Sequence, residues 1–556
     1  MGLGVLEVRG TAKGHHVPGT VLLDTLDASA EVNVELEAAG LKKGSGKNSE
    51  IILVPQPSSD PNDPLNWPLW QRDLILLLYC FCTMCCIGGV GPILSSMAIP
   101  FIMEWGITFT DVSLLTGYQL CAVGAVGVVV SACARKFGKR PTLLWSISCA
   151  FAGTVWGGVA KSYGSLVGAR VLQGLGIAMF ESVTYAIIGD LYHVHQRGTR
   201  MTYYILAQSG LAQFPTVIAG KITTDLGWRW VFYLLSIFMG LGWALSIFFG
   251  WETVYNRNAM YNLDTSSRSK VDKAIQPNSK GSTHEVEDIG KTPTLETVVT
   301  ATTGGERIRE TYFQRIKPFH GVFTEDALWK MIVRPFYVLL NPAVLWACII
   351  IAFTTVWIIV ISFCIAQAFS VPPFLLNTAQ LGYVSAGPLV GGLLGCISCG
   401  LICDPLARYL TRKNNGIYEP EFRLPMMIFV PIVSTVGYFL FGNLIQQGQS
   451  PVGASVMFGL VFVSVQFCAV STGAYIVDAF RDISVETFVI SMTFKNFIFF
   501  AFTFFLNEWF ASWGPAKMFN TIGGIQLALS LTTIPVYVYG KRIRAWWHAH
   551  DLLRKN

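Results

Sequence analysis

Residues 170–190 read "RVLQGLGIAMFESVTYAIIGD", an apolar run that nevertheless contains Arg170, Gln173 and Glu181. Crossing the hydrocarbon layer of a bilayer takes about 20 mostly apolar residues, and an ionised group at its centre costs several kcal/mol. A helix with this sequence cannot favourably turn its charged residues toward lipid. The stretch therefore predicts a membrane-spanning helix whose polar side faces other helices or a water-filled cavity.

The composition of the whole chain agrees with a membrane protein. Of 556 residues, 52% are hydrophobic and 13% are charged, whereas soluble domains carry about 25% charged residues. Twelve segments are long and apolar enough to span a bilayer: Leu74–Met97, Val112–Ala132, Thr142–Ala160, Leu166–Ile188, Thr202–Ile222, Val231–Phe249, Val344–Ile365, Leu381–Ile402, Leu424–Ile445, Val452–Val477, Thr487–Leu506 and Thr521–Tyr539. We predict an all-α polytopic membrane protein with 12 transmembrane helices in two six-helix bundles.

The chain has a net charge of +6, and its basic residues lie in alternate loops, as the positive-inside rule expects of cytoplasmic loops. The residues in question are Arg135, Lys136, Lys139, Arg140, Arg197, Arg200, Arg408, Arg412, Lys413, Arg481, Lys541, Arg542 and Arg544. We therefore expect the protein to lie in the plasma membrane, with both termini in the cytoplasm. The expected partners are the lipid bilayer, protons and a small-molecule substrate, with no nucleic acid, and the chain is expected to be a monomer.

Two long polar stretches divide the chain. We expect a disordered cytoplasmic tail over 1–58, an N-terminal six-helix bundle over 59–252, a cytoplasmic linker over 253–335, a C-terminal bundle over 336–540 and a cytoplasmic tail over 541–556. The cysteines of "CFCTMCC" (80–86) and "CISC" (396–399) lie within apolar spans without histidines at zinc-ligand spacing. We interpret them as packing residues and predict neither a metal site nor a cofactor.

Several motifs resemble those of the major facilitator superfamily. The loop "SACARKFGKRP" (131–141) is similar to its G-x-x-x-D-R-x-G-R-R loop, and Arg170, Gln173, Gly174 and Gly176 match its R-x-x-Q-G-x-G. The stretches "LGWRWVFYL" and "WETVYNR" resemble fungal twelve-span drug/proton antiporters, and "DLYHVHQRGTR" and "NNGIYEPEFRL" resemble the subgroup with polyamine and histidinol permeases. The resemblance implies the major facilitator fold and proton-coupled transport.

The sequence departs from these motifs in two places. Arg135 replaces the aspartate of the loop motif, so the usual contact of that aspartate with a neighbouring helix is not expected. In span five, "QFPTVIAGK" places the motif associated with export out of register. Asp404, by contrast, keeps the G-x-x-x-D spacing from Gly400 in the second half.

Glu181 is the main candidate for a functional group. At 100° and 1.5 Å per residue, Arg170 and Glu181 lie within about 20° of each other and about 16 Å apart along a helix. Our hypothesis is that Glu181 lines a central cavity and alternates between binding a proton and interacting with substrate. The alternatives are a neutral packing residue or a permanent pair with a base. Arg170 is expected, from the resemblance, to assist proton transfer, or else to bond neighbouring helices.

A second group of candidates lies elsewhere in the spans. Asp478 and Lys495 are expected to neutralise each other, either permanently or in a pair that opens during the transport cycle. With Arg135, Arg140 and Asp404 they form our set of gating or structural charges. Softer candidates for a substrate cavity, chosen as aromatic or amide side chains inside or at the ends of spans, are Tyr118, Gln119, Tyr204, Gln208, Trp357 and Gln367.

The sequence favours a transporter over an enzyme. It has no phosphate-binding G-x-x-x-x-G-K-[ST] loop and no H-E-x-x-H motif. Two bundles joined by a polar loop are typical of secondary transporters with a substrate site at the midplane. The leading prediction is a proton-coupled exporter of a small organic molecule such as a drug, toxin or secondary metabolite. The alternatives are a proton-coupled importer of polyamines or other organic cations, and a non-transporting nutrient sensor.

Overall fold

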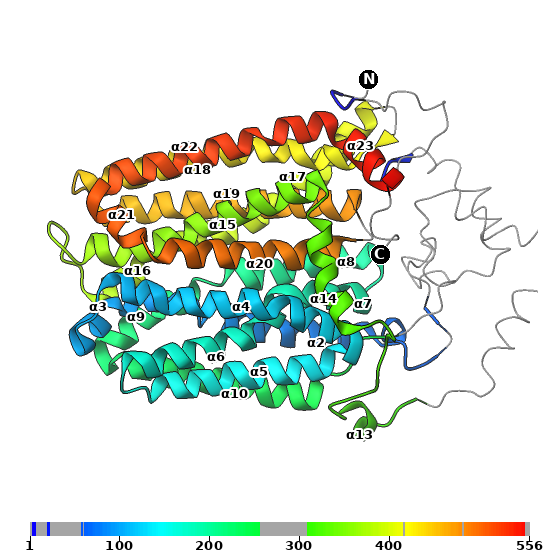
Figure 1. Cartoon of the computed structure of the whole chain (residues 1–556), viewed down its shortest axis with the longest axis horizontal. Coiled ribbons are helices and arrows are strands. Elements are labelled where there is room, and N and C mark those ends of the chain that lie inside the picture. Colours follow the sequence, from blue (N-terminus) through cyan, green and yellow to red (C-terminus); the bar gives the residue numbers. More distant parts are fainter. Residues whose placement is uncertain are drawn as a thin grey trace, which may run out of the picture.

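The computed structural model describes residues 3–6, 19–22, 57–58, 60–255, 309–414, 417–480 and 483–550. Long helices lie side by side in two bundles, the first half of the chain in one and the second half in the other (Figure 1). The expectations for most of the N-terminal tail, for linker residues 256–308, for Arg481 and for residues 551–556 lie outside the described residues.

The N-terminal bundle consists of six helical rods. In chain order they are α2 (Leu69–Thr83), η4 (Met84–Gly88) and α3 (Ile93–Trp105); α4 (Phe109–Phe137); α5 (Lys139–Gly158); α6 (Tyr163–Ser182) and α7 (Thr184–Leu191); α8 (Val194–Ile205), η5 (Leu206–Gly210) and α9 (Phe214–Leu226); and α10 (Trp228–Phe249). The short helix η3 (Pro64–Asn66) precedes the first rod. Both η4 and η5 are π-helical turns, and they contact each other where the first and fifth rods cross.

The C-terminal bundle repeats the arrangement. Its rods are α15 (Pro342–Phe369); α16 (Thr378–Val384) and α17 (Ala386–Lys413); η7 (Pro420–Ile428) and α18 (Phe429–Gln446); α19 (Pro451–Ala479); α20 (Ser484–Thr503) and α21 (Leu506–Trp513); and α22 (Pro515–Leu531) and α23 (Thr533–His550). Before it come α13 (Tyr312–Arg315) and α14 (Leu328–Val338). Strands β1 (Val21–Leu22) and β2 (Ile417–Tyr418) pair antiparallel, with Val21 opposite Tyr418.

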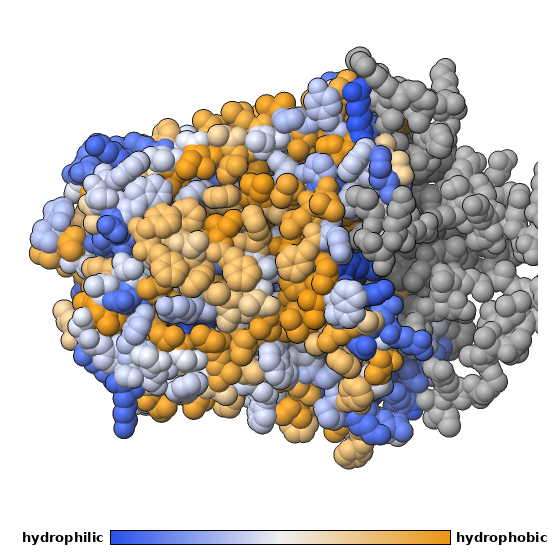
Figure 2. Space-filling model, in the orientation of Figure 1, coloured by the Kyte–Doolittle hydropathy of each residue, from blue (hydrophilic) through white to orange (hydrophobic). Residues whose placement is uncertain are grey.

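The predicted twelve-helix architecture is confirmed. In the described residues, 10 helices are long and apolar enough to cross a membrane, and these include ten of the twelve rods. The remaining two are α5 and the rod α8–η5–α9, whose serine, threonine, arginine and glutamine side chains lower their hydropathy. Figure 2 shows a hydrophobic band across the middle of the molecule with hydrophilic residues toward both ends. All thirteen cysteines lie in described residues as free thiols.

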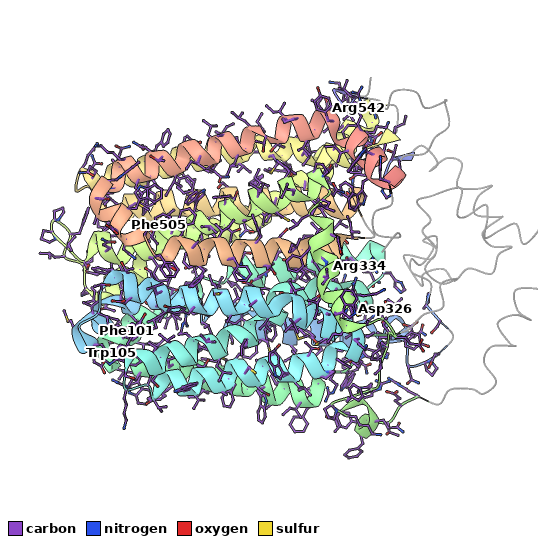
Figure 3. All side chains as sticks on the ribbon, in the orientation of Figure 1. Phe101, Trp105, Asp326, Arg334, Phe505 and Arg542 are labelled. Atoms are coloured by element: carbon purple, nitrogen blue, oxygen red, sulfur yellow. The ribbon has the colours of Figure 1, made fainter. Side chains whose placement is uncertain are left out.

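The basic loops gather at one end of the bundles, which we call the basic end. Arg334 and Arg542 lie there, whereas Phe101 and Trp105 lie at the opposite end (Figure 3). The turn between α4 and α5 shows how this end is built. Gly138 adopts φ +100°, and the carboxylate of Glu252 accepts hydrogen bonds at 3.0 Å from the backbone N–H groups that begin α5. Glu252 thus satisfies donors that a helix start leaves unpaired.

The two bundles touch along their whole length. At the end opposite the basic loops, α9 crosses α16, where a Cβ on Gly220 would lie 2.6 Å from the Thr378 carbonyl oxygen. In the middle α4 runs along α20, with Gly124 facing Asn496. At the basic end α14 contacts both α4 and α20. Residues near the end of α6 and in the middle of α20 are therefore enclosed between the bundles.

Replacing Gly391 by alanine is expected to lower the thermal stability of the purified protein. A Cβ at this position of α17 would lie 2.1 Å from the carbonyl oxygen of Gly459 on α19, and a backbone atom cannot give way alone. Overfilled contacts cost about 1–3 kcal/mol, so the melting temperature in detergent should fall by about 1–3 °C. Gly400→Ala, also on α17, meets no atom of the described residues within 4 Å and serves as the control. Equal melting temperatures would contradict the described contact.

Candidate functional site

Glu181 and Lys495 meet between the two bundles. Glu181 is the second-last residue of α6 in the N-terminal bundle, and Lys495 lies in the middle of α20 in the C-terminal bundle. Lys495 Nζ lies 3.1 Å from Glu181 Oε1, and Asn496 Nδ2 donates to Glu181 Oε2 at 3.2 Å. Each charged side chain is 8% exposed. Of the alternatives left open for Glu181, the structure shows a pair with a base, and this base belongs to the opposite bundle.

Glycines hold α6 in the position that makes this pair. A Cβ on Gly174 would lie 2.3 Å from the carbonyl oxygen of Gln119 on α4. A Cβ on Gly176 would lie 2.4 Å from the backbone nitrogen of Ala150 on α5. Close approach of helices through small residues is common in membrane bundles. Since α4 also packs along α20, the glycine contacts of α6 fix the depth at which Glu181 reaches Lys495.

The expected pairing of Asp478 with Lys495 is wrong. Asp478 lies at the basic end, where its Oδ2 accepts from Arg423 Nε at 3.1 Å and from the Tyr418 hydroxyl at 2.5 Å. Burial and the carboxylate of Asp478 both raise the pKa of Tyr418, so this hydroxyl keeps its proton. Lys495 stands 11 residues beyond Ser484, the start of α20, which places it about 16 Å deeper. The two residues are neighbours in sequence but lie at different depths.

Arg423 also binds Asp404, the aspartate whose spacing from Gly400 follows the loop motif. Arg423 Nη1 lies 2.6 Å from Asp404 Oδ1. The guanidinium thereby joins the carboxylates of α17 and α19. Both Asp404 and Asp478, predicted as gating or structural charges, thus converge on one arginine that the sequence reasoning missed.

Arg170 is fully buried and does not contact Glu181. Its guanidinium donates to the Val90 carbonyl at 2.8 Å, to Gln173 Oε1 at 3.0 Å and to Thr116 Oγ1 at 3.4 Å. These partners connect α6 with α4 and with the turn after η4. The contacts match the helix-bonding alternative for Arg170, while its part in proton transfer stays a prediction.

Two of the softer candidates lie close to Glu181. Tyr204 on α8 stacks edge-on against Tyr185 with ring centroids 5.0 Å apart, and its hydroxyl donates to the Phe180 carbonyl. Gln208, on the π-helical turn η5, accepts a 2.5 Å hydrogen bond from the Tyr185 hydroxyl. Tyr185 therefore links both candidates to the helix that follows Glu181.

Three other candidates lie apart from the ion pair, two on α4 and one on α15. Tyr118 packs against Phe500 with ring centroids 5.7 Å apart. Gln119 is buried, and its Oε1 has no hydrogen-bond partner among the described residues. Gln367 Nε2 donates to the carbonyl of Asn507 at 3.2 Å, within the C-terminal bundle. None of the three touches the Glu181–Lys495 pair through a described hydrogen bond.

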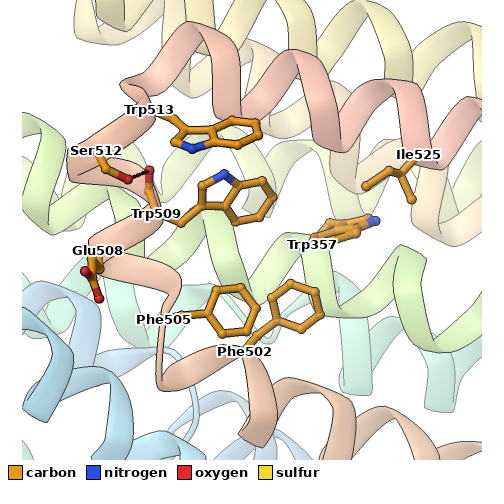
Figure 4. Close-up of a pocket in the computed structure, with 8 residues that line it drawn as sticks. All are labelled: Trp357, Phe502, Phe505, Glu508, Trp509, Ser512, Trp513 and Ile525. Atoms are coloured by element: carbon orange, nitrogen blue, oxygen red, sulfur yellow. Dashed lines mark hydrogen bonds between the residues drawn. The ribbon is translucent and has the colours of Figure 1, made fainter.

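Trp357 lines a different pocket. A cavity of about 430 Å³ lies between α15, α20, α21 and α22 of the C-terminal bundle. Figure 4 shows the rings of Trp509 and Trp513 one above the other, Trp357 beside Ile525 at the right, and Glu508 on the opposite side at the left. The full lining is Trp357, Phe502, Phe505, Glu508, Trp509, Ser512, Trp513 and Ile525. This pocket is lined by the C-terminal bundle alone, and the part of Trp357 in substrate binding stays a prediction.

Arg135 takes part in a charged contact that links the two bundles at the basic end. Its Nη2 lies 2.9 Å from Glu486 Oε1, and Nε of Arg334 lies 3.2 Å from the same oxygen. Glu486 is in the first turn of α20, and Arg334 is on α14, which crosses between the bundles (Figure 3). Arg135 stands where the loop motif has an aspartate. It still contacts a neighbouring helix, but here the loop supplies the positive charge and the helix supplies the carboxylate. The sequence offered one signal that Glu486 matters: acidic residues are common in the first turn of a helix, and Glu486 is at the start of a predicted one.

Arg140 is a structural charge. It is fully buried and donates to the carbonyl oxygens of Ile247 at 2.7 Å and of Gly250, at the end of α10. It also donates to the carbonyls of Ile316 and Lys317 at 2.8 Å. Cationic side chains stabilise the C-terminal ends of helices, where carbonyl groups lack partners. Through these hydrogen bonds Arg140 connects the start of α5 with the end of α10 and with the segment after α13.

The fold and these buried charges define an α-helical membrane protein of two six-helix bundles with an ion pair between them. The model of the Major Facilitator Superfamily matches residues 76–492, which include most of both bundles. The chain therefore belongs to the Major Facilitator Superfamily, as the motifs predicted, and its members are transporters rather than enzymes.

Similar proteins come from fungi and bacteria. The chain is 24% identical to Protein HOL1 of Saccharomyces cerevisiae over 576 residues, covering 96% of each chain. It is 23% identical to the MFS-type transporter penM of Penicillium rubens, covering 92% of this chain and 94% of that one. The proton:xylose symporter XylE from E. coli shares the fold, with a TM-score of 0.55 at 13% identity over 86% of this chain and 98% of that chain.

Proposed function

We propose that this protein is a proton-coupled secondary active transporter of a small organic molecule and works by alternating access. The observation that supports the proposal is the buried pair of Glu181 and Lys495, which joins the two bundles. Alternating access rocks one bundle against the other around a central site. The two charges therefore lie on bundles that move apart during the cycle. The free-energy cost of separating the charges must be offset.

A proton on Glu181 supplies this compensation. Breaking a buried ion pair costs about 3–5 kcal/mol when one charge is left without a partner. A protonated carboxyl group is neutral and can leave Lys495 without exposing a negative charge to the interior. Proton binding on one side of the membrane and release on the other would then accompany each reorientation of the bundles.

The position and orientation in the cell follow from the charge distribution. The basic end carries Arg135, Arg140, Arg334 and Arg542, and positively charged loops face the cytoplasm in most membrane proteins. We place this end, with both termini, in the cytoplasm and the protein in the plasma membrane. The similarity to fungal transporters supports a fungal setting.

Two directions of transport have separate support. Export of a drug, toxin or secondary metabolite is favoured by the sequence motifs that resemble drug/proton antiporters. Uptake is favoured if the proton and the substrate bind at the same time. The pair of opposite charges formed by Glu181 and Lys495 permits such a site. A sensor would bind its ligand without moving it.

The test uses proteoliposomes that contain the purified protein and a pH-sensitive dye. Spermidine, an azole and a fungal metabolite extract are added outside, with the membrane potential clamped. We expect at least one of them to change the internal pH in wild-type vesicles and not in protein-free vesicles. A rise in pH indicates exchange for protons, and a fall indicates transport with protons. Ligand binding without any proton movement would contradict the proposal.

A further inference from the structure

The charges inside the membrane-spanning part of the chain do not balance. The twelve predicted spans contain four charged residues: Arg170, Glu181, Lys221 and Lys495. Lys221 lies near the end of α9 and pairs with the exposed Asp225 at 3.0 Å. The interior thus holds two cationic side chains and one carboxylate.

Arg170 has no carboxylate partner in the described part of the chain. Its side chain is fully buried, and its three hydrogen bonds go to neutral oxygens of Val90, Gln173 and Thr116. Its Nε has no hydrogen-bond partner at all among the described residues. Buried charges are normally paired, so the interior carries an excess positive charge even while Glu181 and Lys495 are together.

Protonation of Glu181 increases this excess. Once Glu181 is neutral, the ammonium of Lys495 has lost its charged partner, and the amide of Asn496 has lost the anion to which it donates. An ammonium group and an amide N–H in adjacent positions of α20 can both donate charge-assisted hydrogen bonds to a carboxylate. An amine in the same place would add a further positive charge beside Lys495.

From these contacts we infer that the substrate carries a carboxylate, which binds Lys495 and Asn496 in place of Glu181 while Glu181 holds the proton. This inference rests on the proposed proton coupling at Glu181. The loaded site contains a neutral carboxyl group, an ammonium and the substrate anion, so it has the same charge as the empty site. Proton and substrate strengthen each other's binding and move in the same direction, which favours uptake under an inward proton gradient and argues against polyamines.

In the described part of the chain, three titratable side chains interact with Glu181. Lys495 faces it from α20, and the hydroxyl groups of Tyr185 on α7 and Tyr204 on α8 interact with it electrostatically. Tyrosine, with an ordinary pKa of about 10, does not titrate between pH 6 and 8. Because the proposed complex requires a proton on Glu181, anion binding should become tighter as the pH falls.

The test measures ligand binding to the purified full-length protein by the shift of its melting temperature at pH 6 and pH 8. Two matched sets of probes differ in the group at one position: glucuronate, glucuronamide and 6-amino-6-deoxyglucose, and phenylacetate, phenylacetamide and phenethylamine. We expect stabilisation by a carboxylate member alone, with an apparent Kd at least about fivefold lower at pH 6. Stabilisation by an amine, or by no carboxylate in either set, would overturn the inference.

Variants assign the effect to the named residues. Lys495→Gln should lose carboxylate binding and Lys495→Arg should keep it, whereas Lys517→Gln, at an exposed lysine, should behave as wild type. Glu181→Gln should bind the carboxylate with little dependence on pH. If Lys495→Gln does not fold, the neutral double variant Glu181→Gln/Lys495→Gln replaces it. Carboxylate binding that survives loss of the Lys495 charge would overturn the inference.

The two proposals fail in different ways. Proton movement driven only by an amine in the vesicle assay would refute the carboxylate inference and leave proton-coupled transport standing. Carboxylate binding that strengthens at low pH without any proton movement would support the binding site and refute transport.

Discussion

Replacing Glu181 by glutamine is expected to reduce substrate-driven proton movement by at least about tenfold. Glutamine keeps the size of the side chain and can accept a hydrogen bond from Lys495 or Asn496, but it cannot take up a proton in the cycle. The measurement is the initial rate of the internal pH change in proteoliposomes. Asp225→Asn, which removes a carboxylate from an exposed pair with Lys221, is the matched control and should keep the wild-type rate.

The outcome is informative only if the variant folds. Glu181→Gln leaves Lys495 buried without a charged partner, which is costly. A second variant, Glu181→Gln/Lys495→Gln, removes both charges and should be at least as stable as the single variant in a thermal melt, yet equally unable to move protons. Wild-type proton movement in either variant would show that Glu181 is a packing residue and that the proton is carried elsewhere.

Replacing Glu486 by glutamine is expected to open the basic end. The carboxylate binds Arg135 and Arg334 together, so its loss leaves two cationic side chains facing each other across the bundles. We expect the ratio of open to closed forms at this end to rise about tenfold, which corresponds to ~1.4 kcal/mol. Faster amide hydrogen exchange in α14 and in the first turn of α20 would report the change, and the transport rate should fall.

The matched variant for this contact is Arg334→Gln. It leaves the shorter bond between Arg135 and Glu486 in place and should give a smaller increase in exchange. Arg135→Gln combined with Glu486→Gln should cost little more than Glu486→Gln alone, since both remove the same interaction. Additive effects of the two substitutions would mean that Arg135 and Glu486 act independently.

Much of the fold could be predicted because the signals for it are local. Hydropathy over 20-residue windows located the twelve spans, and the arginines of alternate loops located the basic end. The importance of Glu181 could also be predicted from the sequence, because a carboxylate is rare within an apolar span. The breaks within the first and fifth rods were not foreseen, since no residue of η4 or η5 enforces a π-helical turn by itself.

The partners of the charged residues depended on information that a single sequence does not contain. Glu181 and Lys495 are 314 positions apart, and their contact follows from the depth at which α6 and α20 pack against α4. The need of a buried charge for a partner does not say which residue supplies it, and Asp478 binds Arg423 while Lys495 binds Glu181. Trp357 was predicted to line a substrate cavity from its place in a span, and its ring lies among Phe502 and the tryptophans of α21.

The neutrality of the Glu181–Lys495 pair has an electrical consequence. An elementary charge carried through a membrane potential of about 100 mV gains or loses about 2.3 kcal/mol. The two central charges of the empty transporter cancel, so this pair adds no voltage dependence to the return step. If the bound proton is matched by a substrate anion, the loaded form is equally insensitive. Such a carrier would generate no steady current, and only the concentration gradients of proton and substrate would set its direction.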